Sequence, residues 1–190
     1  HAELYGIPTF VVEPRAFETR EAWAEKLLEN VQFWQPDLTV LAGFMRILPP
    51  NFVNALRPNL INTHPSLLPA FPGAHAVRDA LDAKATVTGV TIHVVDEGVD
   101  TGEHLAQAEV AILPDETEHE LHERIKTVER QLLVQVVRDI AEALDEPIGA
   151  ISSVIAAKGW YTRLRAPEHT RELGSGHQSP HYARIARDVA

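Results

Sequence analysis

The sequence predicts an α/β fold in which a mostly parallel sheet is flanked by helices. Two observations support this fold class. Short apolar runs alternate along the chain with longer segments whose apolar residues recur at helical spacing. The run at residues 38–44 is apolar almost throughout, as in a parallel strand that is covered on both faces. In sheets of this kind, ligands bind beyond the carboxyl ends of the strands.

The first third of the chain contains two strand–helix pairs. Residues 8–12 form a short run of strand character, and residues 17–33 carry apolar side chains at helical spacing. Residues 38–44 are the next strand. Pro50 suits the first turn of a helix, so a short helix is expected over 50–56.

The alternation continues to about residue 144. A strand is expected over 60–64 and a helix over 73–83. Two runs rich in β-branched residues, at 88–95 and 104–113, are the next strands. A long helix is expected over 116–144, with acidic residues in its first turn.

The composition is that of a globular domain, with 45% apolar and 23% charged residues. A net charge of −10 argues against non-specific nucleic-acid binding, which depends on basic side chains. No apolar run approaches the roughly 20 residues that cross a bilayer, so no membrane partner is expected. The absence of cysteine excludes disulfides and thiol catalysis. With no visible signal peptide, a cytoplasmic location is expected.

The chain divides into two parts by composition. Residues 1–145 carry the alternating pattern and form one predicted domain. Residues 146–190 form a C-terminal extension whose structure the sequence does not define. Its stretch from 151 to 190 holds six Lys or Arg against three acidic residues and is therefore basic, unlike the rest of the chain.

Asn62 and His64 stand two residues apart in the strand predicted at 60–64. Side chains at this spacing point to the same face of a sheet. Pro65 follows and favours an extended backbone at His64. An Asn amide beside a protonated His can hold a carbonyl oxygen and stabilise an oxyanion. The same pair could also be buried polar residues that the backbone satisfies, and the residues alone leave both interpretations open.

The segment 96–102, DEGVDTG, is the second candidate element. Its glycines allow backbone amides to approach a ligand closely, and Asp100 could orient His64 and favour its imidazolium form. The alternative is an ordinary acidic connection between two strands.

Ten histidines make a metal site worth testing. His64, His75 and His93 have no spacing typical of a compact metal motif. His119 and His122 are close together but fall on a predicted helix face that is exposed. The sequence therefore predicts no bound metal.

Four motifs in chain order resemble the formyltransferase family that uses 10-formyltetrahydrofolate. They are NTHPSLLPAFPG at 62–73, AGFMRIL at 42–48, GVTIHVVDEGVDTG at 89–102 and RIKTVE at 124–129. The similarity runs from residue 1 to about 144 and is greatest to the branch that formylates phosphoribosylglycinamide (GAR). It implies a Rossmann-like fold and transfer of a formyl group from 10-formyltetrahydrofolate to the GAR amine in purine biosynthesis.

The resemblance also implies residue roles. Asn62 would hold the formyl oxygen, His64 would be the general acid and oxyanion partner, and Asp100 would support His64. The folate-binding residues would be Arg20, Met45, Arg46, Ile47, Leu48, Asn62, Val95, Asp96, Glu97, Gly98, Val99 and Asp100. The GAR-binding residues would be Lys126, Thr127, Val128 and Glu129. The partners would be these small molecules, with a homodimer possible.

Family members begin with a strand and a Gly-Ser-Asn-rich loop that grips the substrate phosphate. Neither precedes residue 8, so the first βα unit is expected to be missing and activity toward GAR to be weak or absent. Two alternatives remain open: a folate-binding module without activity, and a formyltetrahydrofolate deformylase, which usually carries a second His where this chain has Pro65. A methionyl-tRNA formyltransferase would need a basic domain longer than the extension here.

Overall fold

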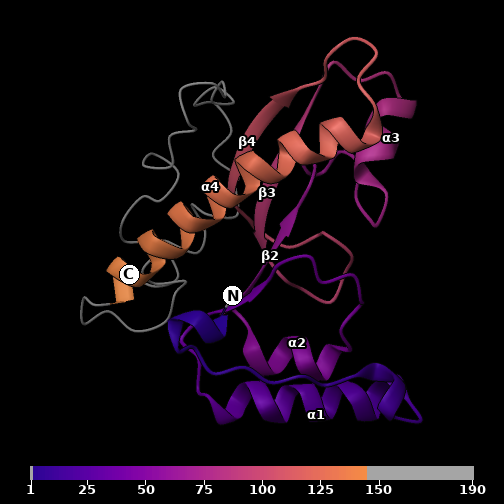
Figure 1. Cartoon of the computed structure of the whole chain (residues 1–190). Coiled ribbons are helices and arrows are strands. Elements are labelled where there is room, and N and C mark those ends of the chain that lie inside the picture. The colour runs from indigo at the N-terminus through magenta and orange to yellow at the C-terminus, as the bar shows by residue number, and fades with distance from the viewer. Residues whose placement is uncertain (1, 145–190) are drawn as a thin grey trace, which may run out of the picture.

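A computed structural model describes residues 2–144, and they form a four-stranded sheet with helices packed around it (Figure 1). The α/β fold class is therefore confirmed. The extension predicted at 146–190 lies outside the described residues. In chain order the helices and strands are α1 Arg20–Phe33, β1 Thr39–Leu41, α2 Pro50–Leu56, β2 Leu60–His64, α3 Ala76–Asp82, β3 Val87–Val94, β4 His104–Ala111 and α4 Glu118–Leu144, preceded by 3₁₀ turns at Ala2–Tyr5 and Pro14–Ala16.

The sheet is mixed, which corrects the expectation of a mostly parallel sheet. Its order is β1-β2-β3-β4. Only β1 and β2 run parallel, and the other two pairs are antiparallel. The β3–β4 connection, residues 95–103, is shorter than the dozen residues that a parallel crossover requires. Between β2 and β3, the seven-residue helix α3 spans about 10 Å. Most of the connection between these strands, residues 65–86, is therefore loop rather than a crossover helix, and β3 returns antiparallel to β2.

The strand predicted at residues 8–12 does not form. Among the described residues nothing pairs with this segment, and Phe10 and Val11 are exposed. Val12 joins this segment to the fold: its carbonyl oxygen accepts a hydrogen bond from Trp23 Nε1 at 2.9 Å, and its side chain packs against the apolar cluster around Trp23. An apolar run becomes a strand only where a neighbouring ladder satisfies its backbone. The prediction was therefore wrong here.

Local capping sets the other element boundaries. Helix α1 begins at Arg20 because the Thr19 hydroxyl accepts from Ala22 N. Thr117 and Glu120 form a reciprocal capping box before α4: the Thr117 hydroxyl accepts from Glu120 N, and the Glu120 carboxylate accepts from Thr117 N. Strand β1 is shorter than predicted because Gly43, at φ 64°, turns the chain out of the sheet.

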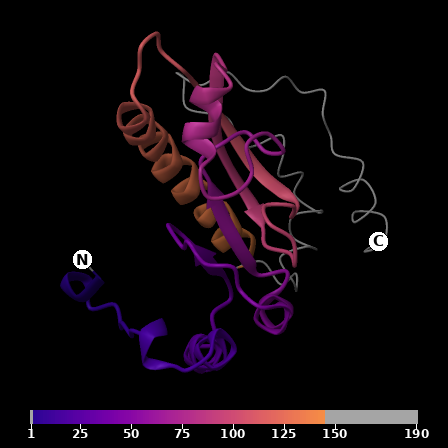
Figure 2. The ribbon, with the colours of Figure 1, turned by 90° about the vertical axis from the view of Figure 1, so that its right-hand side faces the viewer.

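Two apolar clusters hold the elements together. Helix α4 crosses one face of β3 and β4 (Figure 2), and Ile125 and Val136 of α4 belong to the same buried cluster as Ile92 of β3. Helices α1 and α2 pack side by side at the β1–β2 side of the sheet, through Trp23 and Phe52 (Figure 1). The site lies between these two clusters.

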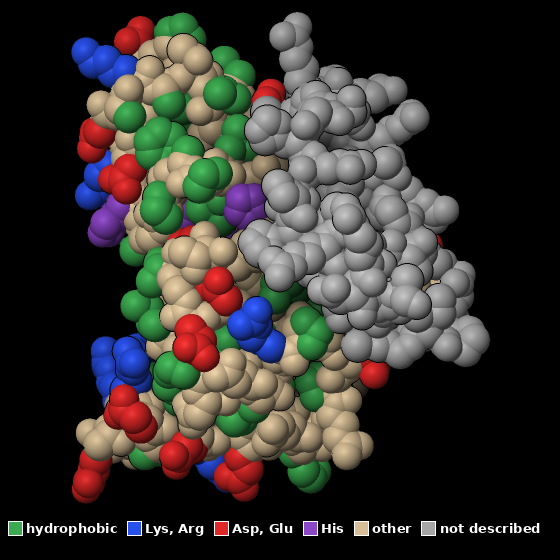
Figure 3. All heavy atoms as spheres, turned by 180° about the vertical axis from the view of Figure 1, so that it is seen from behind, with side chains coloured by type: hydrophobic (Ala, Val, Ile, Leu, Met, Phe, Trp, Pro, Cys, Tyr) green, Lys and Arg blue, Asp and Glu red, His purple; other side chains and the backbone are tan. Residues whose placement is uncertain are grey.

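On the face opposite to the view of Figure 1, acidic and basic side chains of the described residues are interspersed (Figure 3). Within residues 2–144, no helix is both long and apolar enough to cross a membrane.

Candidate active site

Strand β2 carries Asn62 and His64 into a pocket of about 250 Å³. His64 is only 4% exposed, and Asn62 is half-buried. The intervening Thr63 turns toward α4, where its hydroxyl donates to Glu129 Oε1 at 2.6 Å. Asn62 and His64 therefore share one face of the sheet, as the sequence predicts.

The second wall of the pocket is the connection between β3 and β4. Asp96 Oδ1 accepts from Gly98 N at 3.0 Å and from the Thr101 hydroxyl at 2.7 Å, which closes a tight turn. Asp100 then adopts φ 54°, in the left-handed region. This turn directs the Asp100 carboxylate back toward β2.

Asp100 joins the elements of the site. Its Oδ2 accepts from Gly73 N at 2.7 Å and lies 3.4 Å from His64 Nδ1. The other ring nitrogen of His64, Nε2, is 2.8 Å from the Phe71 carbonyl oxygen. Both ring nitrogens thus face oxygen acceptors, an arrangement that an imidazolium satisfies with two donated hydrogen bonds.

His93, on β3, is a site residue that the sequence considered only as a metal ligand. The antiparallel register places it opposite Asn62, and its Nε2 lies 3.2 Å from Asn62 Nδ2. Burial lowers the pKa of His93, although the Val94 carbonyl and the Asp100 charge act in the opposite direction. His93 is recognised as a site residue only from the antiparallel register of β2 and β3, which the spacing of residues in the sequence does not reveal.

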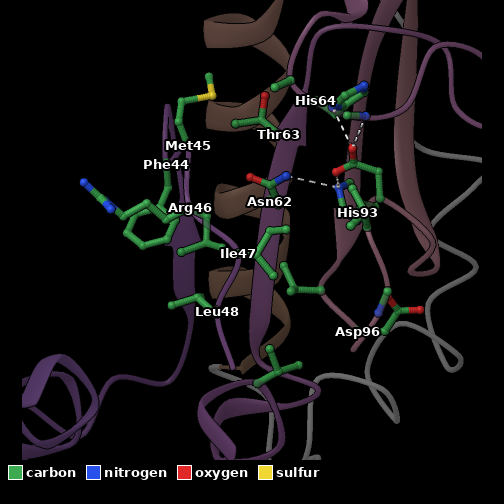
Figure 4. Close-up of a pocket in the computed structure, with 18 of the residues that line it drawn as sticks. Phe44, Met45, Arg46, Ile47, Leu48, Asn62, Thr63, His64, His93 and Asp96 are labelled. Carbon is green, nitrogen blue, oxygen red and sulfur yellow. Dashed lines mark hydrogen bonds and ion pairs between the residues drawn. The ribbon is translucent and has the colours of Figure 1, made fainter. Parts of the chain in front are cut away.

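The predicted folate-binding residues fall into two groups. Met45, Arg46, Ile47 and Leu48 line the pocket, as do Val95, Asp96, Gly98, Val99 and Asp100. Glu97 and Arg20 do not. Glu97 accepts a hydrogen bond from Asn54, and Arg20 lies exposed beside Glu21. The Arg46 guanidinium points away from Asn62 and lies 5.6 Å from the centre of the Trp23 ring (Figure 4).

The predicted GAR-binding residues lie on α4, and none of them lines the pocket. Lys126 pairs with Glu123, and the Thr127 hydroxyl donates to the Glu123 carbonyl oxygen. Val128 packs against the core. Glu129 alone reaches the site, through its hydrogen bond with Thr63.

The described residues contain no group of three or more His, Cys, Asp or Glu side chains that could hold a metal ion. The pocket offers amide, imidazole and carboxylate groups. These groups suit a reaction in which a carbonyl oxygen becomes an oxyanion and a proton is transferred.

Comparison with known proteins agrees with this geometry. The family described as formyl transferase matches residues 1–137. The chain is 48% identical over 136 residues to a phosphoribosylglycinamide formyltransferase of Mycobacterium tuberculosis (strain CDC 1551 / Oshkosh), covering 72% of this chain and 63% of that protein. It is 37% identical over 139 residues to the Bacillus subtilis (strain 168) protein of the same name, covering 73% and 71%.

Solved structures show the same likeness. The crystal structure of phosphoribosylglycinamide formyltransferase from Bacillus halodurans has a TM-score of 0.68 at 40% identity, over 71% of this chain and 70% of that one. Glycinamide ribonucleotide transformylase 1 from Symbiobacterium toebii has a TM-score of 0.71 at 38% identity, over 74% and 66%. The chain spans 63% of the length of the Mycobacterium tuberculosis relative.

Proposed function

This chain belongs to the formyl transferase family, and from this premise we propose that it transfers the formyl group of 10-formyltetrahydrofolate to the amine of GAR, in purine biosynthesis. The observation that carries the proposal is that Asn62, His64 and Asp100 line a single pocket. Relatives at 37% to 48% identity bear the name of this activity.

The reaction would proceed without a covalent enzyme intermediate. The GAR amine attacks the formyl carbon, and the carbonyl oxygen becomes an oxyanion held by the Asn62 amide and the His64 imidazolium. For this, His64 Nε2 exchanges the Phe71 carbonyl oxygen for the substrate, while Nδ1 keeps its contact with Asp100. The bond from carbon to the folate nitrogen then breaks, and His64 protonates that nitrogen. Asp100 stabilises the imidazolium and receives the proton that the amine loses. The products are formyl-GAR and tetrahydrofolate.

The walls of the pocket support folate as the formyl donor. Met45 and Ile47 line the pocket and yet are 75% and 60% exposed, so an apolar rim is open to a flat ring system. Val95, Asp96 and residues 98–100 line the same pocket and would close over the pterin. We further propose that Glu129, which is tied to Thr63, is the part of the 126–129 segment that comes nearest to GAR.

Assay of the full 190-residue chain tests the proposal. Incubation with GAR and 10-formyltetrahydrofolate should yield formyl-GAR, detected by mass, at a rate that the Asn62→Ala substitution lowers on the order of 100-fold. Release of formate at the same rate with and without GAR would contradict the proposal and identify a deformylase. Binding of a folate analogue without either product would identify a binding module.

Two further features belong to the proposal. The partners are these two small molecules, and a homodimer stays a prediction that light scattering of the purified chain tests. A cytoplasmic location also stays a prediction, to be tested by fractionation of cells that express the protein.

A further inference from the structure

Two histidines flank Asp100, and the proposed chemistry uses only one of them. His93 is 2% exposed and lies opposite Asn62 in the strand register. Its Nε2 lies 3.2 Å from Asn62 Nδ2 and 3.6 Å from Asp100 Oδ1 (Figure 4). His93 is therefore adjacent to two of the three residues of the proposed centre.

The contacts of His93 determine which of its nitrogens carries a proton. Nδ1 lies 3.0 Å from the Val94 carbonyl oxygen, and because a carbonyl only accepts, Nδ1 must be protonated. The Asn62 amide nitrogen only donates, so Nε2 must accept and carries no proton. The ring is therefore neutral, and the burial that lowers the pKa of His93 favours the same form.

The surroundings of His64 favour the opposite state. Its two ring nitrogens lie against the Phe71 carbonyl and Asp100 Oδ2, which both accept. Gly73 N also donates a hydrogen bond to Asp100 Oδ2. The charge of the Asp100 carboxylate therefore stabilises the His64 imidazolium, and a neutral His93 does not compete for that charge.

We propose that neutral His93 is a positioning residue, which holds the Asn62 amide nitrogen toward β3 and leaves its second N–H to reach the formyl oxygen. A proton on His93 Nε2 would face the Asn62 Nδ2 donor and attract Asp100 away from His64. The Asn62 amide would then have to turn, and the point from which it donates would move. This inference rests on the proposed formyl transfer for its kinetic test but not for its spectroscopic test.

The kinetic test compares two substitutions in the full chain. His93→Gln keeps an acceptor near the position of Nε2, whereas His93→Leu removes it. We expect kcat to fall on the order of 100-fold in His93→Leu, the cost of losing one oxyanion donor, with little change in KM. His93→Gln should recover most of that loss. In an Asn62→Ala background, His93→Leu should cost little more, because His93 acts through Asn62. Equal losses in both variants, or additive losses with Asn62→Ala, would overturn the proposal.

The spectroscopic test needs no activity. Nitrogen NMR of the labelled chain should show His93 with Nδ1 protonated and Nε2 unprotonated at neutral pH. The Asn62 side-chain amide signals should shift in His93→Leu and move less in His93→Gln. Thermal unfolding of each variant establishes that it is folded.

A protonated Nε2 on His93 would refute the inference. Absence of formyl-GAR from the wild-type chain, with the NMR result as expected, would refute only the proposed function.

Discussion

Asp100 has a φ of 54°, in the left-handed region that residues other than glycine adopt only occasionally. The conformation persists because the Asp96 turn, the Gly73 amide and His64 all hold the residue in place. Strain of this kind is typical of a position where the direction of one functional group matters more than local stability.

The charge of Asp100 should matter more than its shape. Asp100→Asn keeps the volume but removes the charge that favours the His64 imidazolium. We expect kcat for formyl transfer to fall about 100-fold or more. Steady-state kinetics measures this, with the exposed acid Asp82, at the end of α3, replaced by Asn as the matched control. A variant within a few-fold of wild type would contradict this role.

Gly102 lacks a side chain because the backbone leaves no room for one. A Cβ at this position would collide with the Val94 carbonyl oxygen, which belongs to a strand and cannot move away. Gly102→Ala should lower the free energy of unfolding by roughly 1–3 kcal/mol, as overpacking usually does. Urea denaturation tests this. At Gly98 the obstacle is the Thr101 side chain, which can rotate if it gives up its hydrogen bond to Asp96, so Gly98→Ala should cost less than Gly102→Ala.

At the scale of elements, the Thr91 hydroxyl ties the loop between β2 and α3 to the sheet. Thr91 on β3 accepts from Leu68 N at 3.0 Å and from Gln107 Nε2 at 2.9 Å, and it donates to the Ser66 carbonyl at 2.7 Å. That loop carries the Phe71 carbonyl and the Gly73 amide to His64 and Asp100. A buried threonine outside the pocket lining therefore orients the site.

Replacing Thr91 with the isosteric Val should leave Leu68 N and the Ser66 carbonyl oxygen without their hydrogen bonds to the Thr91 hydroxyl. The expected loss in the free energy of unfolding is about 1–3 kcal/mol for each group left unsatisfied, together with a lower kcat. Thr88→Val, on the same strand, is the matched control, because the Thr88 hydroxyl is buried with no hydrogen-bond partner among residues 2–144. It should unfold no more easily than wild type. Equal losses in the two variants would contradict the role of Thr91.

The sequence predicts some elements better than others for physical reasons. The bounds of α2 and β2 are confirmed, because Pro50 and Pro65 mark their ends locally. The strand directions were predicted wrongly, because direction depends on how far each connection reaches and not on the strand residues. His93 was missed as a site residue for the same reason: its contact with Asn62 exists only through the antiparallel pairing.

At the scale of the whole molecule, the buried His93 and the half-buried His104 make stability depend on pH. Burial lowers the pKa of His93, and burial together with the neighbouring His93 lowers that of His104, both from 6.5. Below 6.5 the unfolded chain therefore binds more protons than the folded one. The free energy of unfolding should fall as the pH drops through this range and should level off above it.

Denaturation at a series of pH values tests this dependence. His93→Gln should make the slope below pH 6.5 shallower, because one of the two titrations is removed. His119→Gln, at an exposed position on α4, should leave the slope as it is in wild type. An unchanged slope in His93→Gln would contradict the assignment.

The antiparallel pairing of β2 with β3 has one more consequence. A slip of two residues would keep the apolar side chains of both strands facing α4, yet it would set Asn62 opposite Thr91 or Val95 in place of His93. The apolar contacts with α4 fit either register equally well, so hydrophobic collapse alone could form a sheet in which Asn62 and His93 are not paired. The Thr91 hydroxyl, bonded to Ser66 and Leu68 just beyond the end of β2, distinguishes the two alignments. These hydrogen bonds of Thr91 therefore favour the native register of β2 and β3 during folding.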